Sequence, residues 1–107
     1  MEIKNLTPHD ITVLAEDGTV LAVIPASGAV ARVSMTRMAI GTVAGLPAYR
    51  LTPGPVVGLP DPSEGVILIV SAMVREAVKG RMDVFSPGDL KRGPDGQPIG
   101  CVGLTGN

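Results

Sequence analysis

Arginine and aromatic side chains are the residues of this chain best suited to hold a small anion. Arg81 lies four residues before Phe85, one of the only two aromatic residues in the chain. A guanidinium presents a planar fork that matches phosphate or carboxylate oxygens, and an aromatic ring offers a face on which a base can stack. Tyr49 and Arg50 form a second such pair. The residue types therefore predict a ligand site for an anion, made of Arg81, Phe85, Ser71, Arg32, Arg50 and Tyr49.

The same side chains also have plain structural interpretations, and the sequence leaves both open. Glu76 and Asp83 are close enough in sequence to pair with the arginines around them, and exposed ion pairs of this kind contribute little to stability. Phe85 could fill the core instead of stacking on a base. Ser71 stands where a helix would begin, and a serine hydroxyl there caps the helix.

Catalytic and metal-binding patterns are weak in this chain. His9 is the only histidine, and a triad of Ser71, His9 and Asp83 would lack the turn that presents a nucleophilic serine. One histidine and one cysteine, Cys101, give no paired spacing for zinc. The stretch 89–95 is rich in glycine and aspartate but lacks the spacing of a calcium loop. We therefore expect a non-enzymatic protein with no metal and no cofactor.

The elements that position the predicted site follow from a change of period near residue 66. Residues 66–70 are an unbroken apolar run, which predicts a buried strand. From Ser71 the apolar residues recur at helical spacing, which predicts a helix over 71–80 with one buried face. That face is expected to contain Val70, Met73, Val74, Ala77 and Val78. Gly80 is expected to end the helix in the left-handed conformation, and the amides at its start are a place to hold an anion.

The residues before position 66 predict β-structure. Asp17-Gly18 predicts a hairpin between strands 11–15 and 19–24, and a further strand is expected over 29–34. Ala44-Gly45 predicts a second hairpin between 37–43 and 46–51, with Ile40 opposite Tyr49 and Ala39 opposite Arg50. The prolines between 53 and 62 predict an extended connection, and 98–104 is expected to be a closing strand. The fold class predicted is α+β: a single domain, 1–107, of mostly antiparallel strands in a small barrel or sandwich with one helix.

Composition and charge limit the partners of the chain. Its 107 residues include 14 Gly and 10 Pro, and its mean hydropathy is positive although large side chains are few. Apolar surface left unburied by so small a core favours a homo-oligomer. The net charge of −1 shows no basic half, which argues against duplex nucleic acid, and no segment has the ~20 apolar residues needed to cross a membrane. A single cysteine and a start without an export pattern predict a cytoplasmic protein.

A family resemblance rests on motifs spread along the chain, beginning with Asn5-Leu6-Thr7-Pro8-His9 and Ile11. The other shared motifs are 24–28 with 30–33, 58–60, 69–71, 80–84 with Pro87, and 95–96 with 99–100. The chain resembles a family of small uncharacterised proteins of actinobacteria and their phages that open with this motif. The resemblance implies a phage or prophage setting and brings no catalytic residues with it.

The sequence leaves two functions from different classes open. The first is an oligomeric binding protein that sequesters an anionic, nucleotide-type signal of bacterial defence, by analogy of size and setting with phage sponges. The second is a structural or protein-interaction accessory protein with no small ligand. An enzyme has the least support, because no general base is convincingly placed.

Overall fold

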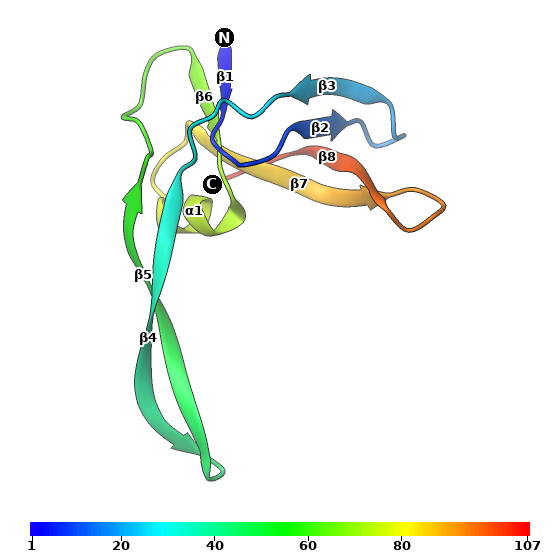
Figure 1. The fold of residues 1–107 in the computed structure, drawn as a ribbon. Helices are drawn as coiled ribbons and strands as arrows, with labels where there is room; N and C mark the ends of the chain where they lie inside the picture. The colour runs from blue at the N-terminus through cyan, green and yellow to red at the C-terminus, as the bar shows by residue number, and fades with distance from the viewer.

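The computed structural model describes residues 1–107, which fold into a mostly β protein with one short helix. A nearly closed, barrel-like sheet has six strands in the order β1–β6–β7–β8–β2–β3 (Figure 1). Its strands are β1 (Glu2–Asn5), β2 (Ile11–Leu14), β3 (Val20–Ile24), β6 (Val66–Ile69), β7 (Val84–Arg92) and β8 (Pro98–Gly106). The helix α1 (Ala72–Ala77) follows β6. The predicted fold class, a mostly β barrel-like domain with one helix, is confirmed. The pairs β2–β3, β4–β5 and β7–β8 are antiparallel as expected, whereas β1–β6, β6–β7 and β2–β8 are parallel.

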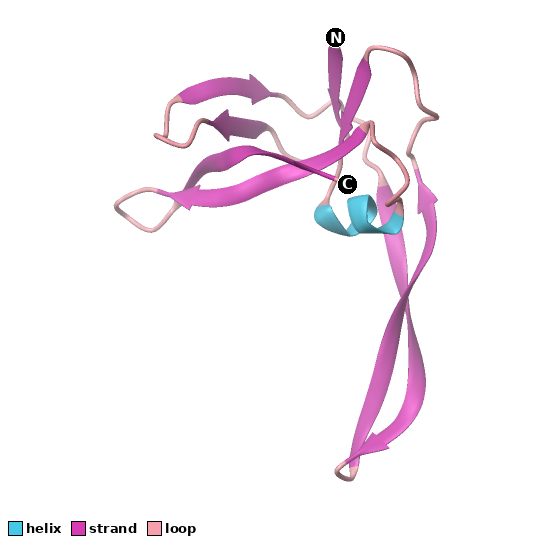
Figure 2. Ribbon diagram, turned by 180° about the vertical axis from the view of Figure 1, so that it is seen from behind, coloured by secondary structure: helices cyan, strands magenta, loops and turns pink.

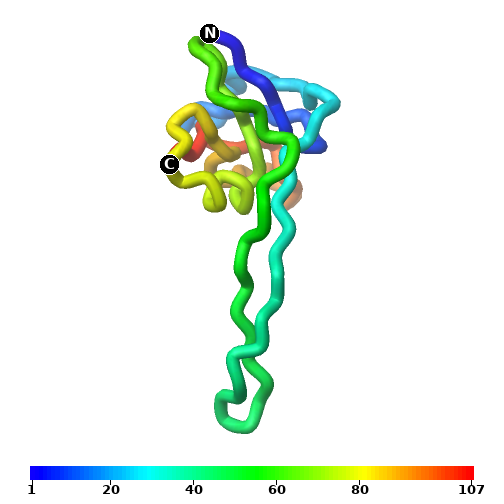
Figure 3. Tube along the Cα trace, turned by 90° about the vertical axis from the view of Figure 1, so that its left-hand side faces the viewer, coloured from blue at the N-terminus to red at the C-terminus, as the bar shows by residue number.

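Two long strands form a second sheet that projects away from the first. β4 (Arg32–Val43) and β5 (Leu46–Val57) pair only with each other, and Figure 3 shows them as a narrow, twisted ribbon. We call residues 32–57 the arm and the rest of the chain the body. The radius of gyration is 16.6 Å, whereas a compact chain of this length would have about 13 Å. The arm is therefore a protrusion and not part of a globular core.

The core of the body lies on both faces of β6. Leu68 and Val70 belong to one cluster, with Val74 of α1, Val84, Leu6 and Ala31. Ile69 points the other way, into a cluster with Ile11, Val13 and Cys101. Successive residues of a strand alternate between its faces, so an unbroken apolar run is what a strand buried on both sides requires. The strand predicted over 66–70 is confirmed at β6.

The predicted hairpins are present, with one change of register and one change of length. Ala44 and Gly45 form the arm's turn, both with positive φ. A bulge between Ala39 and Gly41 places Ala39 opposite Tyr49 and Met38 opposite Arg50, so the predicted pairings of Ile40 with Tyr49 and of Ala39 with Arg50 are both wrong. Pro53 and Pro55 lie inside β5 and not in a connection. Proline is tolerated at a sheet edge where its missing N–H would have faced solvent.

The helix is shorter than predicted and ends differently. It covers six residues, Ala72–Ala77, and its N-cap Ser71 accepts a hydrogen bond from the Val74 amide at 3.2 Å. Val78 terminates it with φ −126° and ψ 49°, while Gly80 does not adopt the predicted left-handed conformation. Val74 is buried as expected, but Met73 is exposed. Figure 2 shows α1 in the angle between the six-stranded sheet and the base of the arm.

Candidate functional site

Arg81, the centre of the site predicted from sequence, is already bound within its own chain. Its Nε and Nη2 atoms donate to the two carboxylate oxygens of Asp83, each at 2.8 Å, and Nη2 also donates to the Pro60 carbonyl at 2.9 Å. The bidentate contact with Arg81 lowers the pKa of Asp83, and the same contact raises the pKa of Arg81. Asp83 and the Pro60 carbonyl together occupy Nε and both N–H groups of Nη2, so no bidentate position remains for an incoming anion and only Nη1 has no hydrogen bond within the chain.

Ser71 and Phe85 also have local structural partners. The Ser71 hydroxyl caps α1, and this one short helix presents only the first turn of a dipole to any ligand. The Phe85 ring lies against Gly106, where an added Cβ would be 2.9 Å from a ring carbon. Neither side chain is free in the way that the predicted site needs.

The remaining predicted residues lie together on the arm. Tyr49 and Arg50 are neighbours on β5, and Arg32 begins β4 at the arm's base. Arg37, which the sequence reading did not single out, stacks on Tyr49 with its guanidinium carbon 4.1 Å from the ring centroid. A cation over an aromatic face at this distance is attracted by the ring's quadrupole. The structure therefore separates the predicted site into a closed part around Arg81 and an open part on the arm.

The arm and the body carry net charges of opposite sign. Arg32, Arg37 and Arg50 are the only charged residues of the arm, which contains no Asp and no Glu. Because the whole chain has a net charge of −1, the body must have −4. All three salt bridges of the chain lie in the body, so the arm's arginines face no carboxylate. Counting charge over 32–57, and not over halves of the chain, would have revealed this positive segment.

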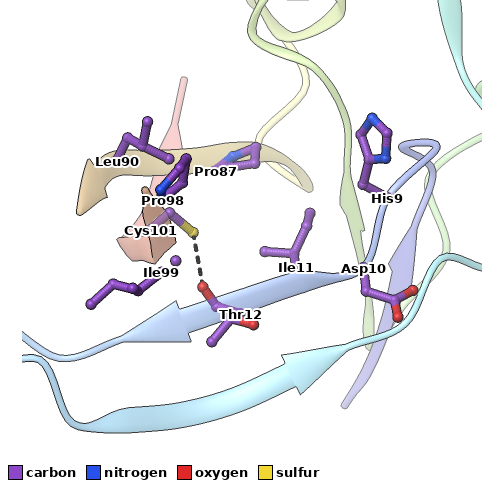
Figure 4. A pocket seen from close by; sticks show the side chains of 10 residues that line it. His9, Asp10, Ile11, Thr12, Pro87, Leu90, Pro98, Ile99 and Cys101 are labelled. Atoms are coloured by element: carbon purple, nitrogen blue, oxygen red, sulfur yellow. Dashed lines mark hydrogen bonds between the residues drawn. The ribbon is translucent and has the colours of Figure 1, made fainter. Parts of the chain in front are cut away.

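A separate cavity of about 510 Å³ lies between β2, β7 and β8. Figure 4 shows His9 and Asp10 at one end of it and Leu90, Pro98 and Ile99 at the other. Cys101 is buried there and donates a weak hydrogen bond to the Thr12 carbonyl at 3.6 Å. No group of three or more His, Cys, Asp or Glu side chains is placed to hold a metal ion. The lining is largely apolar and brings no nucleophile and base together.

The motif at the start of the chain organises a turn of the body. Asn5 is 1% exposed, and its amide nitrogen donates to the carbonyls of His9 and Ile24. Its amide oxygen accepts from the backbone and the hydroxyl of Thr7. Asp10 accepts a hydrogen bond from the Ala26 amide at 2.9 Å. These bonds tie the segment between β1 and β2 to the chain after β3, so the motif is explained by structure and not by ligand chemistry.

Comparisons with known proteins add no further assignment: no protein-family model matches the chain, and no curated protein or solved structure is found to be similar to it. Its single helix is far too short to span a lipid bilayer. The arm, with its unpaired arginines and its stacked tyrosine, is the surface on which a function is best argued.

Proposed function

We propose that this protein is a non-enzymatic binding protein that associates with copies of itself through the arm and holds a small, nucleotide-type anion there. The observation that supports this most is the arm's charge: three arginines, no acidic residue and no salt bridge to the body. Unpaired guanidinium groups on a narrow ribbon attract phosphate, which matches their fork. A protein that binds such a signal without reacting with it would sequester it, and we place this activity in a phage-infected cytoplasm.

The apolar side chains of the arm support the self-association. Met38, Ile40, Val43, Leu46, Leu51 and Val57 are each more than half exposed. An isolated two-stranded ribbon is marginally stable in water, and exposed apolar surface of this kind marks an interaction site. Burying these side chains against a second chain would remove them from water and leave the arginines around a shared seam.

Tyr49 and Arg37 support a nucleotide over a simple anion. Arg37 covers one face of the ring, and the ring remains 46% exposed. A base could stack on the remaining surface of Tyr49 while its phosphate meets Arg37, which lies on the same face of the arm. Stacking of this kind accepts any base, because every base has a π-face.

Calorimetric titration with adenine nucleotides and cyclic dinucleotides tests the proposal. Wild-type protein is expected to bind a member of this panel, and Arg37→Gln and Tyr49→Leu should each weaken binding about ten- to a hundredfold. Arg92→Gln is the matched control, because Arg92 is a body residue that donates only to the Gly96 carbonyl. Absence of binding across the panel, or equal weakening by Arg92→Gln, would contradict an anion site on the arm.

A structural or protein-interaction role is the second candidate, and the tip of the arm favours it. Val43 and Leu46 flank the turn and are 65% and 67% exposed, with no charge between them. Such a tip suits an apolar hollow on another protein. Stable self-association without nucleotide binding would favour this role over sequestration.

A further inference from the structure

The two outer edges of the arm differ in their capacity to accept another strand. Pro47 faces Thr42 and Pro53 faces Met35 across the ribbon. Because proline has no N–H, these must be non-hydrogen-bonded pairs, and the backbone groups of their residues point away from the partner strand. Proline therefore replaces outward-pointing donors on β5, which is how natural sheets protect an edge from pairing.

β4 has no such protection. Hydrogen-bonded and non-hydrogen-bonded pairs alternate along an antiparallel ribbon. The β4 residues whose backbone groups point outward are therefore Met35, Arg37, Ala39 and Thr42, and each has an N–H. The outer edge of β4 makes no backbone hydrogen bond to the body, and β4 pairs with no strand other than β5. A long strand with an open edge and apolar side chains is a template for pairing with a further strand.

We propose that β4 pairs antiparallel with β4 of a second copy of this chain, giving a four-stranded sheet in the order β5–β4–β4–β5. The inference rests on the self-association in the proposed function and identifies its surface. Identical strands related by a two-fold axis meet antiparallel, so one open edge is sufficient for a closed dimer. The proline-containing β5 strands then form the outer edges, which stops further addition.

The position of Arg37 selects the register of this pairing. β4 pairs regularly with β5 between Met35 and Ala39, and the middle of that stretch is Arg37. Centring the two-fold axis there would place two arginines directly opposite each other, which is destabilising. A centre at Thr36 places Arg37 opposite Met35 of the second copy instead, and the two Thr36 side chains face each other in a non-hydrogen-bonded pair.

The charge of the arm gives the pairing a distinctive dependence on salt. Two arms together bring six arginines and no carboxylate into one sheet. Their repulsion falls as salt screens it. Pairing through β4 therefore tightens at higher ionic strength, whereas docking of an arm on the negative body of another copy would weaken.

Cysteine cross-linking tests the geometry with a closely matched pair of variants. Thr36 and Thr52 lie directly opposite each other in the arm, one on each strand. In the proposed dimer, Thr36 also faces Thr36 of the second copy in a non-hydrogen-bonded pair. Cβ atoms in such a pair are about 4.5–5.5 Å apart, within reach of a disulfide after small adjustment. Mild oxidation of Thr36→Cys should give at least tenfold more covalent dimer than oxidation of Thr52→Cys. Equal cross-linking of the two variants, or preferential cross-linking of Thr52→Cys, would overturn the pairing.

Proline substitution tests the same edge without any cross-link. Arg37 and Leu51 face each other in a non-hydrogen-bonded pair, so proline at either position removes only an outward N–H. Arg37→Pro should raise the dimer dissociation constant at least tenfold, while Leu51→Pro and Arg37→Thr should change it much less. A dimer that is insensitive to Arg37→Pro, or that weakens with added salt, contradicts the inference. These measurements use no nucleotide, so failure to bind a ligand does not affect them.

Discussion

The body and the arm use the same apolar residue types in opposite ways. All 14 buried residues of the chain lie in the body, and none lies between residues 32 and 57. The arm nevertheless contains eight large hydrophobic residues that are exposed. Because a two-stranded ribbon has no third layer to cover it, most of its apolar side chains remain at the surface, and only Val33 and Val56 at its base pack against the core of the body. The body therefore buries a core, although nine of its large hydrophobic residues are also exposed, whereas the arm buries no residue. This difference is the basis on which we propose that the arm is a contact surface.

Charge separates the two regions in the same way. In the body, Arg75 and Arg81 pair with carboxylates, whereas the arm's arginines form no salt bridge. Partnered charges fix a structure, and unpartnered charges are available to a ligand.

Replacing an apolar residue by aspartate should unfold the body and spare the arm. Val74 is 1% exposed, so Val74→Asp buries a charge without a partner and should cost several kcal/mol of unfolding free energy. Leu51 is 62% exposed, and Leu51→Asp should change that free energy by less than about 0.5 kcal/mol in the monomer. Urea titration followed by circular dichroism measures both. Comparable losses in the two variants would remove the distinction between core and contact surface.

Replacing glycine by alanine should also destabilise the body more than the arm, by a smaller amount. A Cβ at Gly88 would be 2.1 Å from the Val102 carbonyl oxygen, whereas one at Gly54 in the arm would be 3.1 Å from the Ser34 carbonyl oxygen. Overpacking typically costs about 1–3 kcal/mol, and the backbone contact at Gly88 puts Gly88→Ala at or above the upper end. Thermal unfolding of Gly88→Ala and Gly54→Ala checks the order. A larger loss at Gly54 would contradict tight packing of β7 on β8.

How far the sequence predicts this molecule differs between the two regions. The strand at β6 and the cap at Ser71 were predictable, because an apolar run and a capping serine are local signals. The length of the arm was not predictable, because Pro53 and Pro55 normally indicate the end of a strand. They are compatible with β5 only because one edge of that strand has no partner. β7 was missed because Ser86-Pro87-Gly88 looks like a turn, and only its packing against Val102 explains the glycine.

The candidate site shows the same limit. The sequence leaves open whether Arg81 binds a ligand or pairs with Asp83, and only the structure shows that Asp83 and the Pro60 carbonyl occupy its guanidinium. Arg32, Tyr49 and Arg50 are exposed on the arm. That Arg37 stacks on Tyr49 follows from the register of the two strands, which the sequence does not fix because of the bulge.

Removing the Asn5 side chain tests whether the opening motif is structural. Asn5→Ala removes the Asn5 partner of the Ile24 carbonyl and of the Thr7 amide, while the His9 carbonyl keeps its bond from the Thr7 hydroxyl; the loss should cost about 1–3 kcal/mol. Asn107→Ala is the control, because Asn107 also donates to two carbonyls, those of Val78 and Arg81, but is exposed. Thermal unfolding should show the larger loss for Asn5→Ala. Equal stability of the two variants would return the motif to the list of ligand candidates.

The smallest expected effect is the loss, in acid, of the stability that the Arg81–Asp83 pair gives to the fold. The folded-state pKa of Asp83 lies below its unfolded value, so the pair stabilises the fold above the unfolded pKa of about 3.9. This contribution is lost as pH falls through the folded pKa. Asp83→Asn should therefore show a shallower decline of melting temperature on acidification below about pH 4 than wild type. Parallel curves for the two proteins would contradict the depressed pKa.

The mass of the full chain in solution tests the central claim, that the arm is a contact surface, most directly. Light scattering at tens of micromolar should give at least twice the monomer mass of 10.9 kDa for wild type. A variant carrying Met38→Thr, Val43→Thr, Leu46→Thr and Leu51→Thr should give the monomer mass while its circular dichroism spectrum and melting temperature, extrapolated to low concentration, stay close to those of wild type. A monomeric wild-type protein, or a variant that still associates like wild type, would contradict the account.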